Sequence, residues 1–83
     1  MKVIKRDGSI VDFDRSKIVI ALTKANDAVE PEECASEEQI ENIVSYIESK
    51  PRTRLLVEDI QDIVEHKLME YGKYSLAKAY IIY

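Results

Sequence analysis

Hydrophobic and polar residues alternate along the first part of the chain with the two-residue period of a β-strand. Residues 2–6 and 10–13 have this pattern, in which successive side chains point to opposite faces. The dipeptide Asp7-Gly8 lies between the two segments, and Asp-Gly between extended segments is typical of a tight hairpin turn. The pattern therefore predicts a β-hairpin at the start of the chain.

The rest of the chain changes to the helical period, with hydrophobic residues three and four positions apart. Four segments have this spacing: residues 15–26, 37–49, 58–71 and 74–83. The positions expected to be buried are, in chain order, Ile18, Ala21, Leu22 and Ala25; Ile40, Ile43, Val44 and Ile47; Ile60, Ile63, Val64 and Leu68; and Leu76, Ala77, Tyr80 and Ile81.

Residues at the ends of these segments support the helix boundaries. Asp14 precedes the first segment and is a good N-cap. Ser36, with Gln39 three residues later, forms a capping box at the second. Pro51 bars continuation of the second helix, and Gly72 is a typical stop for the third.

A short hydrophobic run, residues 54–57, stands between the second and third helices. We expect it to add a third strand to the hairpin, because an isolated hairpin is only marginally stable in water. The predicted fold is therefore α+β, a four-helix bundle capped by a small antiparallel β-sheet. With 83 residues, the chain is expected to form a single domain with one modest core.

Charge is distributed unevenly along the chain, whose formal net charge is −4. Residues 1–24 carry a net charge of +3, residues 25–49 carry −8 and residues 50–83 carry +1. An acidic protein is a poor candidate for nonspecific nucleic-acid binding, which depends on neutralising phosphates. A locally basic end fits a small anionic ligand better, and the acidic segment is expected to be solvated surface, with a Mg²⁺ or partner contact as the alternative.

Few other side chains suggest chemistry. Cys34 is the only cysteine and His66 the only histidine, so we expect no internal disulfide, no metal site and no catalytic residue. A reducing, cytoplasmic location is the expectation from this cysteine usage. No hydrophobic run approaches the roughly 20 residues that cross a membrane, and charges close to the start argue against a signal peptide.

The candidate ligand site lies at the hairpin. Lys5 and Arg6 precede its turn, and Lys17 lies in the first turn of the first helix. A helix N-terminus favours anions because its first N–H groups are unpaired, so this arrangement would suit a phosphate. Strand alternation separates Lys5 from Arg6, which makes Lys5 and Lys17 the expected pair. The alternative is that Lys5 and Arg6 are solvated charges on an edge strand.

Two separated motifs add to this interpretation. The first is Val3-Ile4-Lys5-Arg6-Asp7-Gly8, then Val11-x-Phe13-Asp14 and Lys17-Ile18. The second is Val57-x-x-Ile60-x-x-x-Val64, then Tyr74-x-Leu76-Ala77-Lys78-Ala79-Tyr80-Ile81-x-Tyr83. Together they resemble the ATP-cone, a nucleotide-sensing domain of many ribonucleotide reductase large subunits. The last segment is most similar to the anaerobic, glycyl-radical class.

The resemblance implies a four-helix domain with a three-stranded cap that binds ATP or dATP, as the Mg²⁺ complex, beneath the hairpin. ATP would raise reductase activity and dATP would shut it down, commonly through subunit assembly. The partners implied are the remainder of a reductase catalytic subunit or another copy of it. The contacts implied are phosphates or ribose for Lys5 and Arg6, phosphates for Lys17, adenine for Val3, Val11 and Ile18, and the base or sugar for Asp14.

The chain departs from the family pattern at two further site positions. Val57 and Gln61 stand where some members carry a hydroxyl and an imidazole. The resemblance therefore leaves open whether one or two nucleotides bind. The chain also ends at Tyr83, before an Arg that usually follows, which favours a domain taken from a longer protein.

Two other functions are compatible with the sequence. One is a non-catalytic helical module that docks onto a larger protein without a ligand. The other is the nucleotide-sensing part of a transcriptional repressor. That repressor carries a zinc ribbon before the cone, whereas this chain begins at the first strand, so we rank it last.

Overall fold

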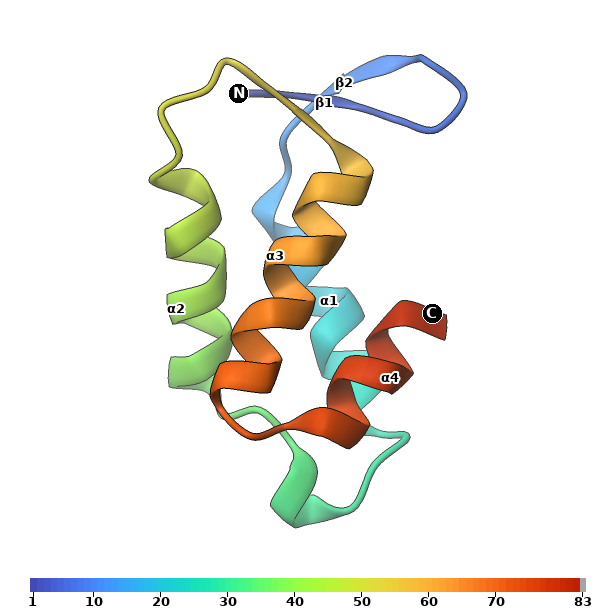
Figure 1. The fold of residues 1–83 in the computed structure, drawn as a ribbon, viewed down its shortest axis with the longest axis vertical. Helices are drawn as coiled ribbons and strands as arrows, with labels where there is room; N and C mark the ends of the chain where they lie inside the picture. The colour runs from blue at the N-terminus through green and yellow to red at the C-terminus, as the bar shows by residue number, and fades with distance from the viewer. Residues whose placement is uncertain (83) are drawn as a thin grey trace.

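The fold places a small β-sheet at one end of a group of helices (Figure 1). A computed structural model describes residues 1–82. The elements in chain order are β1 (Lys2–Ile4), β2 (Ile10–Asp12), α1 (Arg15–Asn26), the short 3₁₀-helix η1 (Pro31–Glu33), α2 (Glu37–Glu48), β3 (Arg54–Leu56), α3 (Val57–Glu70) and α4 (Tyr74–Ile82). The α+β prediction and its four α-helices are confirmed, and Tyr83 lies outside the described residues.

The sheet is mixed, with strand order β2-β1-β3. β1 pairs antiparallel with β2, so that Val3 lies opposite Val11, and parallel with β3, where Val3 lies opposite Leu55. The prediction of an antiparallel sheet is therefore wrong for the third strand. Helices α1 and α2 form a long connection between β2 and β3, and such crossovers permit parallel pairing. No loop separates β3 from α3, because β3 ends at Leu56 and α3 begins at Val57. The first turn of α3 therefore lies beside the sheet.

The hairpin turn is longer than predicted and shortens both strands. The Lys5 amide donates to the Ser9 carbonyl across 2.8 Å, and the Gly8 amide donates to the Lys5 carbonyl across 2.9 Å. Gly8 adopts a φ of 87°, a conformation that glycine reaches without a steric penalty. The Asp7 carboxylate accepts from the Ser9 amide at 2.9 Å. These bonds fix the position of Lys5 and Arg6 relative to the sheet.

The predicted helix caps are all formed. The Asp14 carboxylate accepts from the Ser16 amide, 3.0 Å away. Ser36 Oγ accepts from the Gln39 amide at 3.1 Å, while the Gln39 side chain accepts from the Ser36 amide at 3.0 Å. At the end of α3, Gly72 has a φ of 75°, and the Lys73 amide donates to the Leu68 carbonyl at 2.8 Å. This is the Schellman arrangement, which satisfies the last helix carbonyls.

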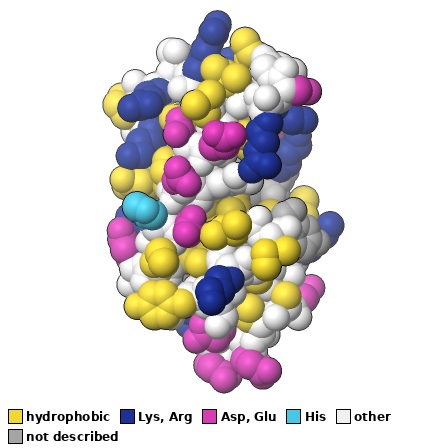
Figure 2. All heavy atoms as spheres, turned by 45° about the vertical axis from the view of Figure 1, so that its right-hand side comes forward, with side chains coloured by type: hydrophobic (Ala, Val, Ile, Leu, Met, Phe, Trp, Pro, Cys, Tyr) yellow, Lys and Arg dark blue, Asp and Glu magenta, His cyan; other side chains and the backbone are white. Residues whose placement is uncertain are grey.

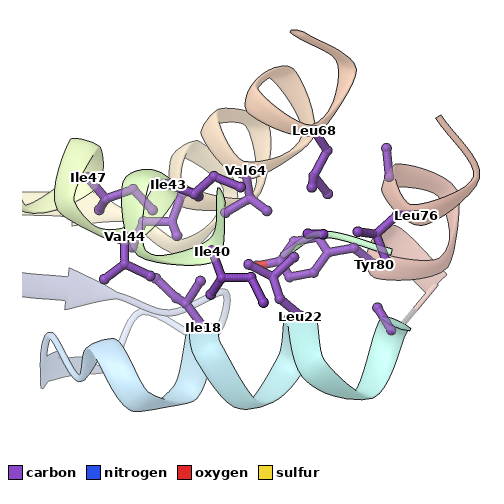
Figure 3. Packing of buried hydrophobic residues seen from close by; sticks show 14 of the residues in the cluster. Ile18, Leu22, Ile40, Ile43, Val44, Ile47, Val64, Leu68, Leu76 and Tyr80 are labelled. Atoms are coloured by element: carbon purple, nitrogen blue, oxygen red, sulfur yellow. The ribbon is translucent and has the colours of Figure 1, made fainter. Parts of the chain in front are cut away.

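The core lies between the four helices (Figure 3). Its fully buried side chains come from α1, α2, α3 and α4: Leu22, Ile43, Val44, Ile47, Val64, Leu68 and Leu76. Val3 and Leu55 extend the core to the sheet. One prediction is wrong, because Ile81 is 53% exposed. It lies five residues after Leu76, which turns it about 140° around the helix from that buried side chain.

A surface ion-pair network joins α1 to α2. The Arg15 guanidinium donates to both oxygens of Glu41, at 2.9 and 3.1 Å, and to both oxygens of Glu48, at 3.1 and 3.2 Å. These bonds raise the pKa of Arg15, and the Arg15 guanidinium lowers the pKa of Glu41. The network connects the first turn of α1 to two positions on α2 that are seven residues apart, Glu41 and Glu48. Within residues 1–82, no helix is long and hydrophobic enough to cross a bilayer.

Candidate functional site

A cavity of about 200 Å³ lies where the sheet meets the helices. Its walls come from the hairpin, the N-terminal part of α1, the first turns of α3 and one residue of α4. The residues that line it are Val3, Lys5, Val11, Asp12, Phe13, Asp14, Lys17, Ile18, Val57, Ile60, Gln61 and Tyr80. Every site residue predicted from the sequence except Arg6 is in this set.

The hydrophobic wall is a consequence of strand register and helix spacing. Val3 and Val11 are directly opposite in the hairpin, so their side chains share one face of the sheet. Ile18 and Ile60 are buried on α1 and α3, and their sides nearest the sheet complete the wall. This surface could hold a flat hydrophobic group such as a nucleobase.

Arg6 does not line this cavity, unlike Lys5, but strand alternation is not the reason, because β1 ends at Ile4. Arg6 Nη2 donates to Gln61 Oε1 across 2.9 Å, and Arg6 Nε lies 3.8 Å from a carboxylate oxygen of Glu58. The arginine therefore reaches from the hairpin to the start of α3. A second, open hollow of about 320 Å³ adjoins it and is lined by Lys5, Arg6, Asp7 and Val57. Lys5 and Val57 belong to both hollows, so the two are adjacent.

The start of α1 contributes a carboxylate and a cation. Hydrogen bonds from the Ser16 hydroxyl and then the Ser16 amide lower the pKa of Asp14, so this carboxylate remains ionised at neutral pH. Lys17 is exposed one turn later on the same rim. Asp12 is paired with Lys2, whose hydrogen bond lowers the pKa of Asp12. The cations at the rim without a paired carboxylate are therefore Lys5 and Lys17, among residues 1–82.

Figure 2 shows how charged side chains are distributed on one face of the molecule. Lys and Arg side chains gather around the sheet end, with several Asp and Glu side chains between them, and further Asp and Glu side chains project at the opposite tip. This agrees with the net charge of +3 over residues 1–24 and −8 over residues 25–49. An anion approaching the sheet end therefore meets the more favourable potential.

The sequence as a whole matches a known family, the ATP cone domain, over residues 1–83. The chain belongs to the ATP-cone family. A ribonucleoside-diphosphate reductase subunit alpha of Chlamydia trachomatis is 37% identical over 94 residues, covering 100% of this chain and 9% of the relative. An anaerobic ribonucleoside-triphosphate reductase of Haemophilus influenzae is 37% identical over 82 residues, covering 98% of this chain and 12% of the relative.

A regulatory protein is also similar to this ATP-cone. The transcriptional repressor NrdR of Gloeothece citriformis is 30% identical over 87 residues, covering 100% of this chain and 46% of the relative. The chain thus spans only a small part of the reductases that it matches. The anaerobic reductase that the closing helix resembles is among the relatives, at the same identity as the diphosphate reductase.

Four lining residues of the ATP-cone cavity were not among the predicted site residues. They are Asp12, Phe13, Ile60 and Tyr80. Phe13 and Ile60 stand in the motifs that carried the resemblance, so motif membership could have indicated them. Tyr80 also stands in one of the motifs, but its spacing with Leu76 and Ala77 predicted an ordinary core position and no contact with a ligand.

A larger hollow of about 520 Å³ lies elsewhere on the ATP-cone, between the α2–β3 connection and α3. Its lining includes Lys50, Arg52, Asp59, Asp62 and His66. Size alone would favour it, but it mixes charges of both signs and contains no predicted site residue. Among residues 1–82, no group of three or more His, Cys, Asp or Glu side chains is placed to hold a metal ion. The smaller cavity, with its hydrophobic wall and basic rim, is the better candidate.

Proposed function

We propose that this ATP-cone binds an adenine nucleotide beneath its hairpin and acts as an allosteric regulatory domain without catalysis of its own. The observation that carries the proposal is the cavity that combines a hydrophobic wall with Lys5 and Lys17 at its rim. A nucleotide has the same two parts, a flat base and a polyanion. The family match over residues 1–83 supports the same assignment.

The two adjacent hollows suggest how the nucleotide is divided between them. About 200 Å³ is less than the roughly 300 Å³ at which typical small-molecule pockets begin. The base would occupy this cavity against Val3, Val11 and Ile18. The phosphates would extend along the rim into the hollow beside Lys5 and Arg6, with Lys17 facing them from α1.

Mg²⁺ would enter with the nucleotide. This ion keeps several water ligands and is usually held through substrate phosphates together with one or two carboxylates. Asp12 and Asp14 line the cavity, but Asp12 is paired with Lys2 and Asp14 caps α1. The chain's own part is to hold the phosphates by charge, and the metal would neutralise the remainder.

Regulation would follow from linkage between the cavity and the surroundings of the domain. A nucleotide that binds one arrangement of the domain more tightly shifts the population toward it. ATP and dATP differ by one 2′-hydroxyl, and a polar group built to bond that hydroxyl could separate them by about 1–3 kcal/mol. The partner would be the remainder of a reductase catalytic subunit or a second copy of it.

Calorimetric titration with ATP, dATP and GTP in the presence of Mg²⁺ tests the proposal. We expect micromolar binding of the adenine nucleotides, weakened by Lys5→Ala and by Lys17→Ala. Lys78→Ala, an exposed lysine on α4, is the matched control and should bind as the wild type does. No heat and no thermal shift with any nucleotide would refute the proposal.

A second candidate, a protein-interaction module, is favoured by the outer face of α4. Tyr74 is 60% exposed and Ile82 is 86% exposed, and exposed hydrophobic clusters often mark interfaces. The two functions are compatible, because a regulatory domain needs a surface that transmits its state. Gel filtration with and without dATP separates them: assembly that ignores the nucleotide would favour a plain docking module.

A further inference from the structure

Tyr80 is the one residue of α4 that reaches the cavity. Its ring is buried among the core side chains, with 9% of the residue exposed. Figure 3 shows the side chain lying between the helices, with its oxygen directed toward Ile18 and Ile40 rather than toward the C-terminal end of α4. Tyr80 therefore lies on the helix-bundle side of the cavity, whereas Lys5 lies on its hairpin side.

The Tyr80 hydroxyl has no hydrogen-bond partner among residues 1–82. Other polar side chains that line the cavity already have hydrogen-bond partners. Asp14 is bonded to Ser16, Asp12 to Lys2 and Gln61 to Arg6. No fully buried side-chain oxygen or nitrogen in this part of the chain lacks a partner. The Tyr80 hydroxyl is therefore accessible from the cavity, and it can donate and accept hydrogen bonds with a ligand there.

We infer that the Tyr80 hydroxyl is a specificity-determining group that bonds the polar edge of the base of the bound nucleotide. This inference rests on the proposed function. The cations Lys5 and Lys17 lie on the rim and suit the phosphates, so the base is the part of the ligand that faces the hydrophobic wall and Tyr80. A base edge carries ring nitrogens and exocyclic groups, which a hydroxyl can meet both as donor and as acceptor.

The chemistry of the hydroxyl agrees with this role. Burial raises the pKa of Tyr80, so the phenol stays neutral and keeps its proton near neutral pH. A neutral group in a hydrophobic wall adds no repulsion toward a polyanion. Selectivity is strong when a site's buried polar group is left without a partner by the wrong ligand. A tyrosine that only filled the core would have no influence on which base is bound.

The test is a double cycle between Tyr80→Phe and changes in the base. The chain and the variant are titrated with Mg²⁺ complexes of ATP, GTP and ATP analogues that each lack one polar atom of the base edge. We expect Tyr80→Phe to weaken ATP about five- to tenfold, the size of one net hydrogen bond. At least one analogue should be weaker than ATP with the wild type and equal to ATP with the variant.

Controls separate this inference from the function on which it rests. Inorganic tripolyphosphate should bind both proteins equally, and Tyr74→Phe, an exposed tyrosine on the same helix, should keep the wild-type base preference. Should Tyr80→Phe fail to fold, the analogue series on the wild type decides, because equal affinity for every analogue overturns the inference. Unchanged base preference in a folded Tyr80→Phe that still binds ATP overturns only the role of Tyr80. A wild-type chain that binds no nucleotide overturns the proposed function as well.

Discussion

Arg6 on the hairpin and Gln61 on α3 are joined by a hydrogen bond of 2.9 Å. The two residues are far apart in the sequence, and the bond crosses from the turn of the hairpin to the helix that forms the opposite wall of the cavity. Arg6 also lies 3.8 Å from Glu58. The hairpin is therefore held over the cavity by a contact that a phosphate could replace, since a phosphate competes with the amide and the carboxylate for the same guanidinium.

Gln61→Ala should loosen the hairpin without unfolding the domain. The hydrogen bond is exposed and Gln61 is only half-buried, so the change in the free energy of unfolding should stay within about 0.5 kcal/mol. Hydrogen exchange of the Lys5 and Gly8 amides, which close the turn, should become faster, while exchange in α2 stays the same. Asp62→Ala, on the same helix, is the control. Equal protection of these amides in Gln61→Ala and wild type would show that the contact does not hold the hairpin.

Arg15→Gln should change the dependence of stability on pH. The Arg15 guanidinium lowers the pKa of Glu41, so their interaction stabilises the fold above the unfolded-state pKa of about 4.3 and is lost as the pH falls through the lower folded-state value. The deficit of the variant should thus be largest near pH 7 and shrink below about pH 4. Thermal unfolding from pH 7 to pH 2.5 measures it, and a deficit independent of pH would contradict the assignment.

Gly8→Ala should destabilise the domain by about 1 kcal/mol through its backbone alone. Gly8 has a φ of 87°, and an added Cβ would meet no atom within 4 Å, so no clash contributes. Gly8→Asn should cost less, because asparagine tolerates this conformation better than alanine. Denaturant unfolding of the three proteins gives the comparison. Equal stability of all three would mean that the turn changes its conformation at little cost.

Binding of the nucleotide should weaken with added salt, because the rim of the cavity acts through charge. Lys17→Ala should lower the affinity for ATP about tenfold at low salt, the value of a charge-assisted hydrogen bond. The difference from the wild type should narrow as the ionic strength rises toward 1 M, where the Debye length is about 3 Å. Calorimetry at several salt concentrations tests this. An affinity for ATP that is independent of salt would indicate that the lysines do not contact phosphates.

Local signals in the sequence were sufficient for most of the fold. Asp14, Ser36 and Gly72 act within one helical turn, so their roles could be predicted from neighbouring residues alone. Strand alternation was not a valid guide to Lys5 and Arg6, because β1 ends at Ile4 and both side chains line the same open hollow. The parallel pairing of β3 could not be predicted in this way, because it depends on where two helices return the chain to the sheet.

The candidate site was harder to predict than the fold. The motif residues indicated the walls, since Val3, Ile18 and Val57 line the cavity. Tyr80 was not predicted as a site residue because its spacing is that of a core residue. Its ring does belong to the core, but the side chain also lines the cavity. The exposed Ile81 shows the converse problem, because a short helix with hydrophobic residues on most of its sides does not reveal from its sequence which side faces inward.

The central position of β1 in the sheet has a consequence for the order of folding. β1 precedes the other two strands of the sheet in the chain, yet its parallel partner β3 follows about 50 residues later. The cavity wall is incomplete until that distant pairing closes, and long loops close slowly. We therefore expect the nucleotide to recognise only the finished fold, so that its stabilisation appears as slower unfolding of the domain and not as faster folding.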